Sequence, residues 1–166
     1  MFRLFSVVAL ALSLSAASVP RKAPAFSMSL ADGSKVSLSQ YRGKVVLMAY
    51  ILTTCSHCQA VTGILSQLQT DLGPRGLQVL ESAVEDDAQH HIADFTAHYK
   101  PSFPVGWSDR ADVAPVLQPD NKLHIMPQSV LIDRKGTIRS QFYGDDPLFD
   151  GDAAKNLTAL IEQYLK

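Results

Sequence analysis

The sequence lacks several features that would place it in a broad class. It has only two cysteines in 166 residues, so a disulfide-rich scaffold is excluded. Its formal net charge is −1 and it contains no run of basic side chains, which argues against nucleic acid as a partner. It also has no internal repeat and no low-complexity tract. With 46% hydrophobic and 19% charged residues, it has the composition and length of one globular domain with a real core.

The N-terminus has a composition of its own. A positive start that includes Arg3 is followed by an apolar stretch over residues 4–14 and by small residues over 15–18. This order predicts a secretory signal peptide over residues 1–18, with cleavage after Ala17 or Ser18. The apolar stretch is shorter than the roughly 20 residues that span a bilayer, although an uncleaved membrane anchor is the alternative. No lipobox cysteine is present, so a lipoprotein is not expected.

The two cysteines, Cys55 and Cys58, lie three positions apart, after an apolar β-like run over 45–52 and before a helix-like run over 59–72. A Cys-x-x-Cys between a strand and a helix is typical of a dithiol/disulfide redox centre. The helix start directs unpaired N–H groups and a partial positive charge at Cys55, which favours its thiolate. Cys58 follows one turn later, close enough to form a disulfide.

Three interpretations of the cysteine pair follow from the residues. In the redox interpretation, Cys55 is the nucleophile and Cys58 resolves the mixed disulfide. A purely structural disulfide is the second, although so small a loop constrains the unfolded chain little. Metal ligation is the third. His57, when protonated, would stabilise the Cys55 thiolate and make the couple a stronger oxidant; otherwise it is an exposed residue without a role.

The remaining pattern predicts an α/β protein. The interval 19–25 has the composition of a linker, and residues 26–166 are expected to form the domain. Its expected elements are a hairpin over 26–30 and 35–38, strands over 76–84 and 103–107, helices after Asp86 or Asp87 and over 111–117, a second hairpin over 128–133 and 137–142, and a closing helix over 157–165.

Four segments carry a resemblance to a known family. They are residues 23–26 together with 38–46, the Cys55-Ser56-His57-Cys58 motif, residues 125–133, and the turn 134–138. Over residues 23–165 the chain resembles the thioredoxin fold, in the TlpA/ResA-like branch that is akin to the AhpC-TSA/redoxin superfamily. The resemblance implies a central mixed sheet flanked by helices, with an N-terminal β-hairpin extension.

The resemblance also implies a function and a site. It implies an exported thiol–disulfide oxidoreductase of the bacterial periplasm, acting on protein thiols, more as a reductant than as an oxidant and supplied by a membrane electron donor. The only redox group would be the Cys55–Cys58 disulfide, with no other cofactor, and a monomer is expected. Met126 and Pro127 match the cis-proline loop of the family, whose backbone pairs with an extended substrate beside the first cysteine.

The chain departs from the family pattern near the motif. Thr54 stands where the family usually has Trp, and His57 where many members have Pro. With Ser56, these residues are expected to tune the couple or line the groove. Members often keep a carboxylate near the buried cysteine to accept its proton, but residues 41–70 contain no acid. Glu81 or Glu85 on the following strand could take that role.

Two other functions remain as alternatives. A copper chaperone similar to the SCO family would use Cys55, Cys58 and His124, although that family has a Cys-x-x-x-Cys spacing. A thiol peroxidase is the weaker alternative, since Leu52 occupies the position of that motif's Thr.

Overall fold

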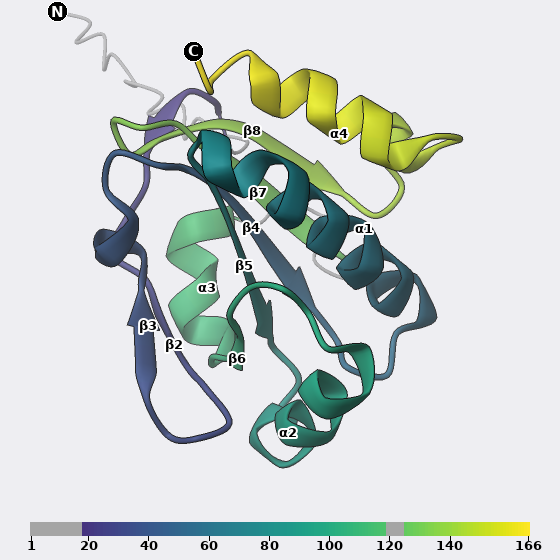
Figure 1. The fold of residues 1–166 in the computed structure, drawn as a ribbon. Coiled ribbons are helices and arrows are strands. Elements are labelled where there is room, and N and C mark those ends of the chain that lie inside the picture. The colour runs from purple at the N-terminus through teal and green to yellow at the C-terminus, as the bar shows by residue number, and fades with distance from the viewer. Residues whose placement is uncertain (1–17, 119–124) are drawn as a thin grey trace, which may run out of the picture.

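A single twisted sheet organises the protein. The computed structural model describes residues 18–118 and 125–166 (Figure 1). Within them the eight strands are ordered β1-β8-β7-β4-β5-β6-β2-β3. The strands are β1 Arg21–Lys22, β2 Ser27–Ser29, β3 Lys35–Ser37, β4 Val45–Ile51, β5 Leu77–Ala83, β6 Val105–Trp107, β7 Gln128–Ile132 and β8 Thr137–Tyr143.

Four α-helices and three short 3₁₀ helices complete these residues. They are η1 Leu38–Tyr41, α1 Ser56–Leu72, η2 Gly73–Arg75, α2 Ala88–Tyr99, α3 Arg110–Leu117, η3 Pro147–Phe149 and α4 Ala153–Glu162. None of the helices in this part of the chain is long and apolar enough to cross a membrane. The predicted signal peptide falls almost entirely on residues 1–17, which lie outside the described residues.

The central strand β4 is buried along its whole length because both faces of the sheet are covered. It pairs in parallel with β5, Val45 opposite Leu77, and antiparallel with β7, Tyr50 opposite Gln128. Alternate residues of β4 enter two separate cores. Val45, Leu47, Ala49 and Ile51 pack with α1, α2 and α4, whereas Val46, Met48 and Tyr50 pack with α3.

These two cores define the layers of the molecule. In Figure 1, α1 and α4 lie side by side across one face of the sheet, and α3 covers the other face, beside the β2–β3 hairpin. The register of β4 with β7 brings the segment before β7, which holds Met126 and Pro127, to the same end of the sheet as the segment between β4 and α1. That end therefore holds the cysteine motif and the predicted proline loop together.

The order of elements follows the sequence prediction, including both hairpins and the closing helix. The interval 19–25, expected as a linker, is more ordered than its composition suggests, because it contains β1. Arg21 pairs with Ile138 of β8, and its guanidinium donates a 2.7 Å hydrogen bond to the Val116 carbonyl. Two residues of edge strand are too few to leave a hydrophobic pattern that a sequence can show.

Candidate active site

Cys55 occupies the N-cap position of α1. Its own N–H donates to the Leu52 carbonyl at 3.1 Å, and its Sγ accepts the backbone N–H of Cys58 at 3.4 Å. The side chain is partly exposed. The sulfur thus lies at the N-terminal end of α1, within reach of solvent and beside the N–H groups of the first turn.

Cys58 lies one turn inside α1 and is completely buried, with 0% exposure. Burial raises the pKa of its thiol well above the ordinary value, and the hydrogen bond with Cys55 and the negative charges of Cys55 and Glu81 act in the same direction. Both cysteines are free thiols in this structure. The pair is therefore asymmetric, since one sulfur can be reached from solvent and the other stays protonated until something removes its proton.

Glu81 on β5 supplies a buried carboxyl beside the second cysteine. Its exposure is 0%, and burial raises the pKa of the carboxyl from 4.5 to about 8, partly offset by the hydrogen bond from Thr62. Glu81 shares a strand face with Val79 and Ala83, which pack in the core under α1. A group that titrates near neutral pH in this place can exchange protons with its surroundings during catalysis.

Thr62 connects Glu81 to the cysteine helix. Its Oγ1 lies 3.0 Å from the Cys58 carbonyl oxygen and 2.9 and 3.1 Å from the two oxygens of Glu81. One hydroxyl proton cannot serve all these acceptors. Thr62 can donate to Glu81 while the carboxyl is ionised, and it can donate to the Cys58 carbonyl when Glu81 is protonated and donates its own O–H to Thr62. Burial raises the pKa of Glu81, whereas the hydrogen bond from Thr62 lowers it.

Glu85, the other acid considered from the sequence, has a different environment. Its Oε1 accepts a 2.8 Å hydrogen bond from the Thr53 backbone N–H and a second, short one from the Thr53 hydroxyl. On the other side, the side-chain amide of Gln59 donates to the Thr53 carbonyl at 2.8 Å. The peptide groups of Thr53 are thus held from both sides, which fixes the segment that leads into Cys55. Glu85 positions this loop, and Glu81 faces Cys58.

The three residues expected to tune the couple surround Cys55 at the surface. Thr54, Ser56 and His57 are all exposed. The His57 ring packs edge-on against Phe149 of η3, with 5.7 Å between ring centroids. Phe149 lies about ninety residues later in the chain, and nothing in the local sequence signals this contact. The histidine is therefore held over the start of α1 by an aromatic neighbour.

The segment with Met126 and Pro127 has the conformation that the resemblance implies. The Met126–Pro127 peptide bond is cis. Met126 is partly buried and packs against both cores. Gly144, just after β8, lies so close to the Met126 carbonyl that a β-carbon there would collide with it. This cis-proline loop is thus packed against the end of β8, at the same end of the sheet as Cys55.

The copper alternative depends on a residue that the structure does not describe. His124, its proposed third ligand, lies outside the described residues. Among residues 18–118 and 125–166, no three His, Cys, Asp or Glu side chains gather as a metal site would require.

Two residues that shape the site were not anticipated from the sequence, Thr62 and Gln59. For Thr62 a signal existed, since it lies four residues after Cys58 on the inner face of the helix.

Comparison with known proteins gives concordant results. Residues 19–141 match the AhpC/TSA family. The thiol-disulfide oxidoreductase ResA of Bacillus cereus (strain ATCC 10987 / NRS 248) is 21% identical over 148 residues, which cover 89% of this chain and 77% of that protein. The thioredoxin-like protein YneN of Bacillus subtilis (strain 168) is 22% identical over 125 residues, covering 75% and 71%.

Solved structures agree on the fold. A thiol:disulfide interchange protein of the thioredoxin family from Chlorobium tepidum TLS superposes with a TM-score of 0.75 at 19% identity, over 91% of this chain and all of that one. A thiol:disulfide interchange protein from Bacteroides sp. gives a TM-score of 0.69 at 21% identity, over 89% and 90%. The thioredoxin-like fold predicted from the sequence is therefore confirmed.

Proposed function

The chain belongs to the AhpC/TSA family, and from that premise we propose that it is a thiol–disulfide oxidoreductase that exchanges disulfides with protein thiols through Cys55 and Cys58. The observation that carries the proposal is the asymmetry of the two sulfurs. Cys55 caps a helix and is partly exposed, whereas Cys58 is buried beside an ionisable carboxyl, Glu81. A structural disulfide needs neither the exposure nor the carboxyl.

In the reducing direction, the Cys55 thiolate attacks one sulfur of a substrate disulfide and forms a mixed disulfide. The first substrate thiolate leaves. Cys58 then gives up its proton to the ionised form of Glu81 and attacks the sulfur of Cys55, which releases the second substrate thiolate. The substrate gains two electrons, and the chain is left with a Cys55–Cys58 disulfide. Regeneration requires a dithiol reductant that returns two electrons to this pair.

The environment of the reaction is part of the same proposal. The apolar stretch at the N-terminus indicates export, and in an oxidising compartment a reductant must be recharged by a membrane electron donor. The ResA relatives are named as thiol-disulfide oxidoreductases, in keeping with a protein disulfide as substrate. Met126, Pro127 and Thr54 would form the groove in which an extended substrate segment lies beside Cys55.

The test uses two matched serine variants and glutathione disulfide. Cys58→Ser is expected to accumulate a stable 1:1 glutathione adduct at residue 55, because the resolving thiol is gone. Cys55→Ser is expected to form no adduct at the buried Cys58 on the same timescale. Peptide mass spectrometry after acid quenching identifies the modified residue. An adduct on Cys58, or none on either variant, would show that the assigned roles are wrong.

A further inference from the structure

A second feature lies at the other end of the sheet from the cysteines. A cavity of about 530 Å³ opens between the N-terminal segment around Lys22, the η1 segment, the start of β4 and the β7–β8 turn. Lys44 precedes the first residue of β4 and Cys55 follows its last, so the seven-residue strand, about 23 Å long, separates them. The cavity, here called the basic cavity, therefore plays no part in thiol exchange.

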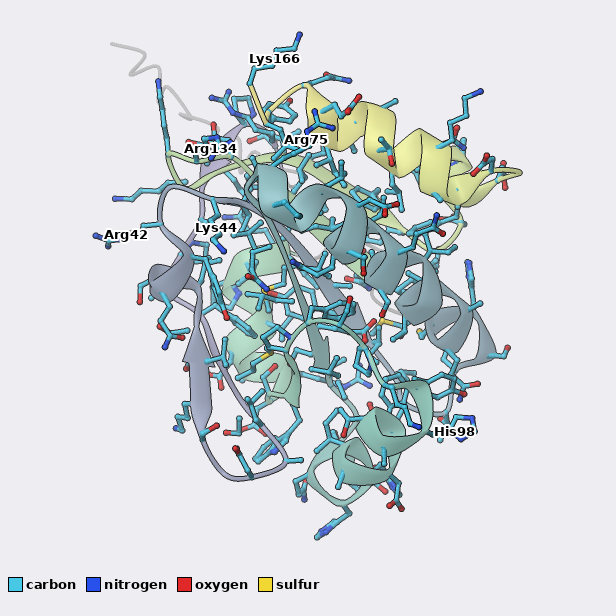
Figure 2. All side chains as sticks on the ribbon, in the orientation of Figure 1. Arg42, Lys44, Arg75, His98, Arg134 and Lys166 are labelled. Atoms are coloured by element: carbon cyan, nitrogen blue, oxygen red, sulfur yellow. The ribbon has the colours of Figure 1, made fainter. Side chains whose placement is uncertain are left out.

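Cations surround the basic cavity. Lys22, Arg42, Lys44 and Lys135 line it and are exposed. None of the four is in an ion pair within residues 18–118 and 125–166. Figure 2 shows Arg42 and Lys44 on the same side of the molecule, far from His98 on α2. Four like charges around one hollow repel each other, and an anionic ligand removes that repulsion.

The two other charged residues of the wall are already engaged. Asp133 accepts a 2.7 Å hydrogen bond from Arg139 and two more from backbone N–H groups of the β7–β8 turn. Arg134 donates to the carbonyls of Gly43, Arg75 and Leu165. Arg139, which lies outside the cavity, therefore neutralises Asp133. Arg134 connects three chain segments through its hydrogen bonds. The hydrogen bonds of Asp133 and Arg134 thus fix the shape of the cavity without involving its four exposed cations.

Part of the lining of the basic cavity is apolar. Leu38 and Tyr41 of η1 are half-buried and pack against the core beneath α3, to which the buried Val46 and Ile132 also belong. A cavity of this volume is in the range that accommodates small ligands. The basic side chains at the rim and the apolar side chains of the lining together favour a ligand that has an anionic group and an apolar part.

We propose that the basic cavity binds a phosphate group that carries an apolar substituent. Phosphate suits the rim because the planar guanidinium of Arg42 matches its oxygens and the three lysines add positive point charges opposite its negative charge. A soluble organic phosphate and the headgroup of an anionic phospholipid both offer this chemistry. The cavity binds it independently of the redox state of the cysteines.

Isothermal titration with n-hexyl phosphate and with inorganic phosphate tests the binding. Hexyl phosphate is expected to saturate one site and to bind at least tenfold more tightly than inorganic phosphate, because only it reaches the apolar surface. The double variant Arg42→Gln/Lys44→Gln should weaken binding at least tenfold. The matched control Lys35→Gln/Lys155→Gln removes two exposed cations elsewhere and should bind as the unmodified protein does.

A second arm separates the sources of the phosphate. The protein is sedimented with vesicles of phosphatidylcholine that contain one quarter phosphatidylglycerol. If it binds these vesicles, and if Arg42→Gln/Lys44→Gln loses this binding while the control variant keeps it, the ligand is the lipid headgroup. Hexyl phosphate binding without vesicle binding identifies a soluble ligand. Equal losses in both double variants, or no saturable binding, would overturn the proposal. The glutathione adduct of Cys58→Ser does not depend on these cations, so the two proposals fail separately.

Discussion

Replacing Glu81 by Gln tests the buried carboxyl at the centre of the site. Glutamine has nearly the same shape and keeps a hydrogen-bonding group beside Thr62, but it cannot ionise. Glu81 is fully buried, so its charge is not screened by solvent. We expect two results from Glu81→Gln: a changed dependence of stability on pH, and loss of the pH-dependent acceleration of the step in which Cys58 attacks.

The size and sign of the stability effect follow from the pKa. The carboxyl titrates at about 8 in the native protein and has an ordinary value of 4.5. Between these values the native state holds a proton that the unfolded state has released. The free energy of unfolding therefore falls as pH rises, by about 1.4 kcal/mol per pH unit from this group. Raising the pH from 5 to 7 therefore lowers the free energy of unfolding by about 3 kcal/mol through this group, and Glu81→Gln lacks this decrease.

Urea unfolding of the reduced protein at pH 5, 6 and 7 measures the effect. The difference in unfolding free energy, variant minus unmodified protein, should increase by about 3 kcal/mol across this range, because all other titrating groups cancel. Glu162→Gln, which removes an exposed carboxylate paired with Arg75, is the control and should give a nearly constant difference. A pH-independent difference for Glu81→Gln would refute the raised pKa and with it the assigned proton acceptor.

Three further changes address the surroundings of the site. Glu85→Ala leaves both donors of Thr53 without their acceptor and should cost about 1–3 kcal/mol in urea unfolding and slow alkylation of the first cysteine; unchanged values for both would remove Glu85 as a positioning residue. His57→Pro, in the first turn of α1 where proline is tolerated, should lower the reduction potential in glutathione titrations, and an unaltered potential would eliminate His57 from tuning. Gly144→Ala should destabilise the protein by about 1–3 kcal/mol through collision with the cis-proline loop, whereas Gly63→Ala, at an open position in α1, should stabilise it slightly; similar effects of the two would contradict the packing described.

The periodic parts of the fold could be predicted because local hydrophobic pattern reflects burial directly. The unbroken apolar run over residues 45–51 predicted a strand covered on both faces, and β4 is buried along its whole length. The turn residues of both hairpins lie where glycine adopts positive φ, at Gly33 and Gly136. The edge strand β1 could not be foreseen, since it is held by pairing with β8 and by the hydrogen bonds of Arg21 to α3.

For the site, sequence spacing placed both sulfurs but could not separate the two acids. Glu81 and Glu85 lie four residues apart, near the end of one strand, and only the register of β5 under α1 shows that one faces Thr62 while the other binds Thr53. The packing of His57 on Phe149 depends on the path of η3, which no local pattern encodes. Contacts between distant segments are the part of the site that the sequence left open.

The reduction potential of the Cys55–Cys58 couple tests the central claim most directly. Oxidised and reduced forms are quantified by alkylation and mass spectrometry after equilibration in dithiothreitol or glutathione buffers. We predict one reversible two-electron transition with a midpoint at or below about −250 mV, as in thioredoxin-type reductants. A midpoint above about −180 mV would contradict the reducing role, and failure of the two cysteines to form a disulfide would contradict the redox centre itself.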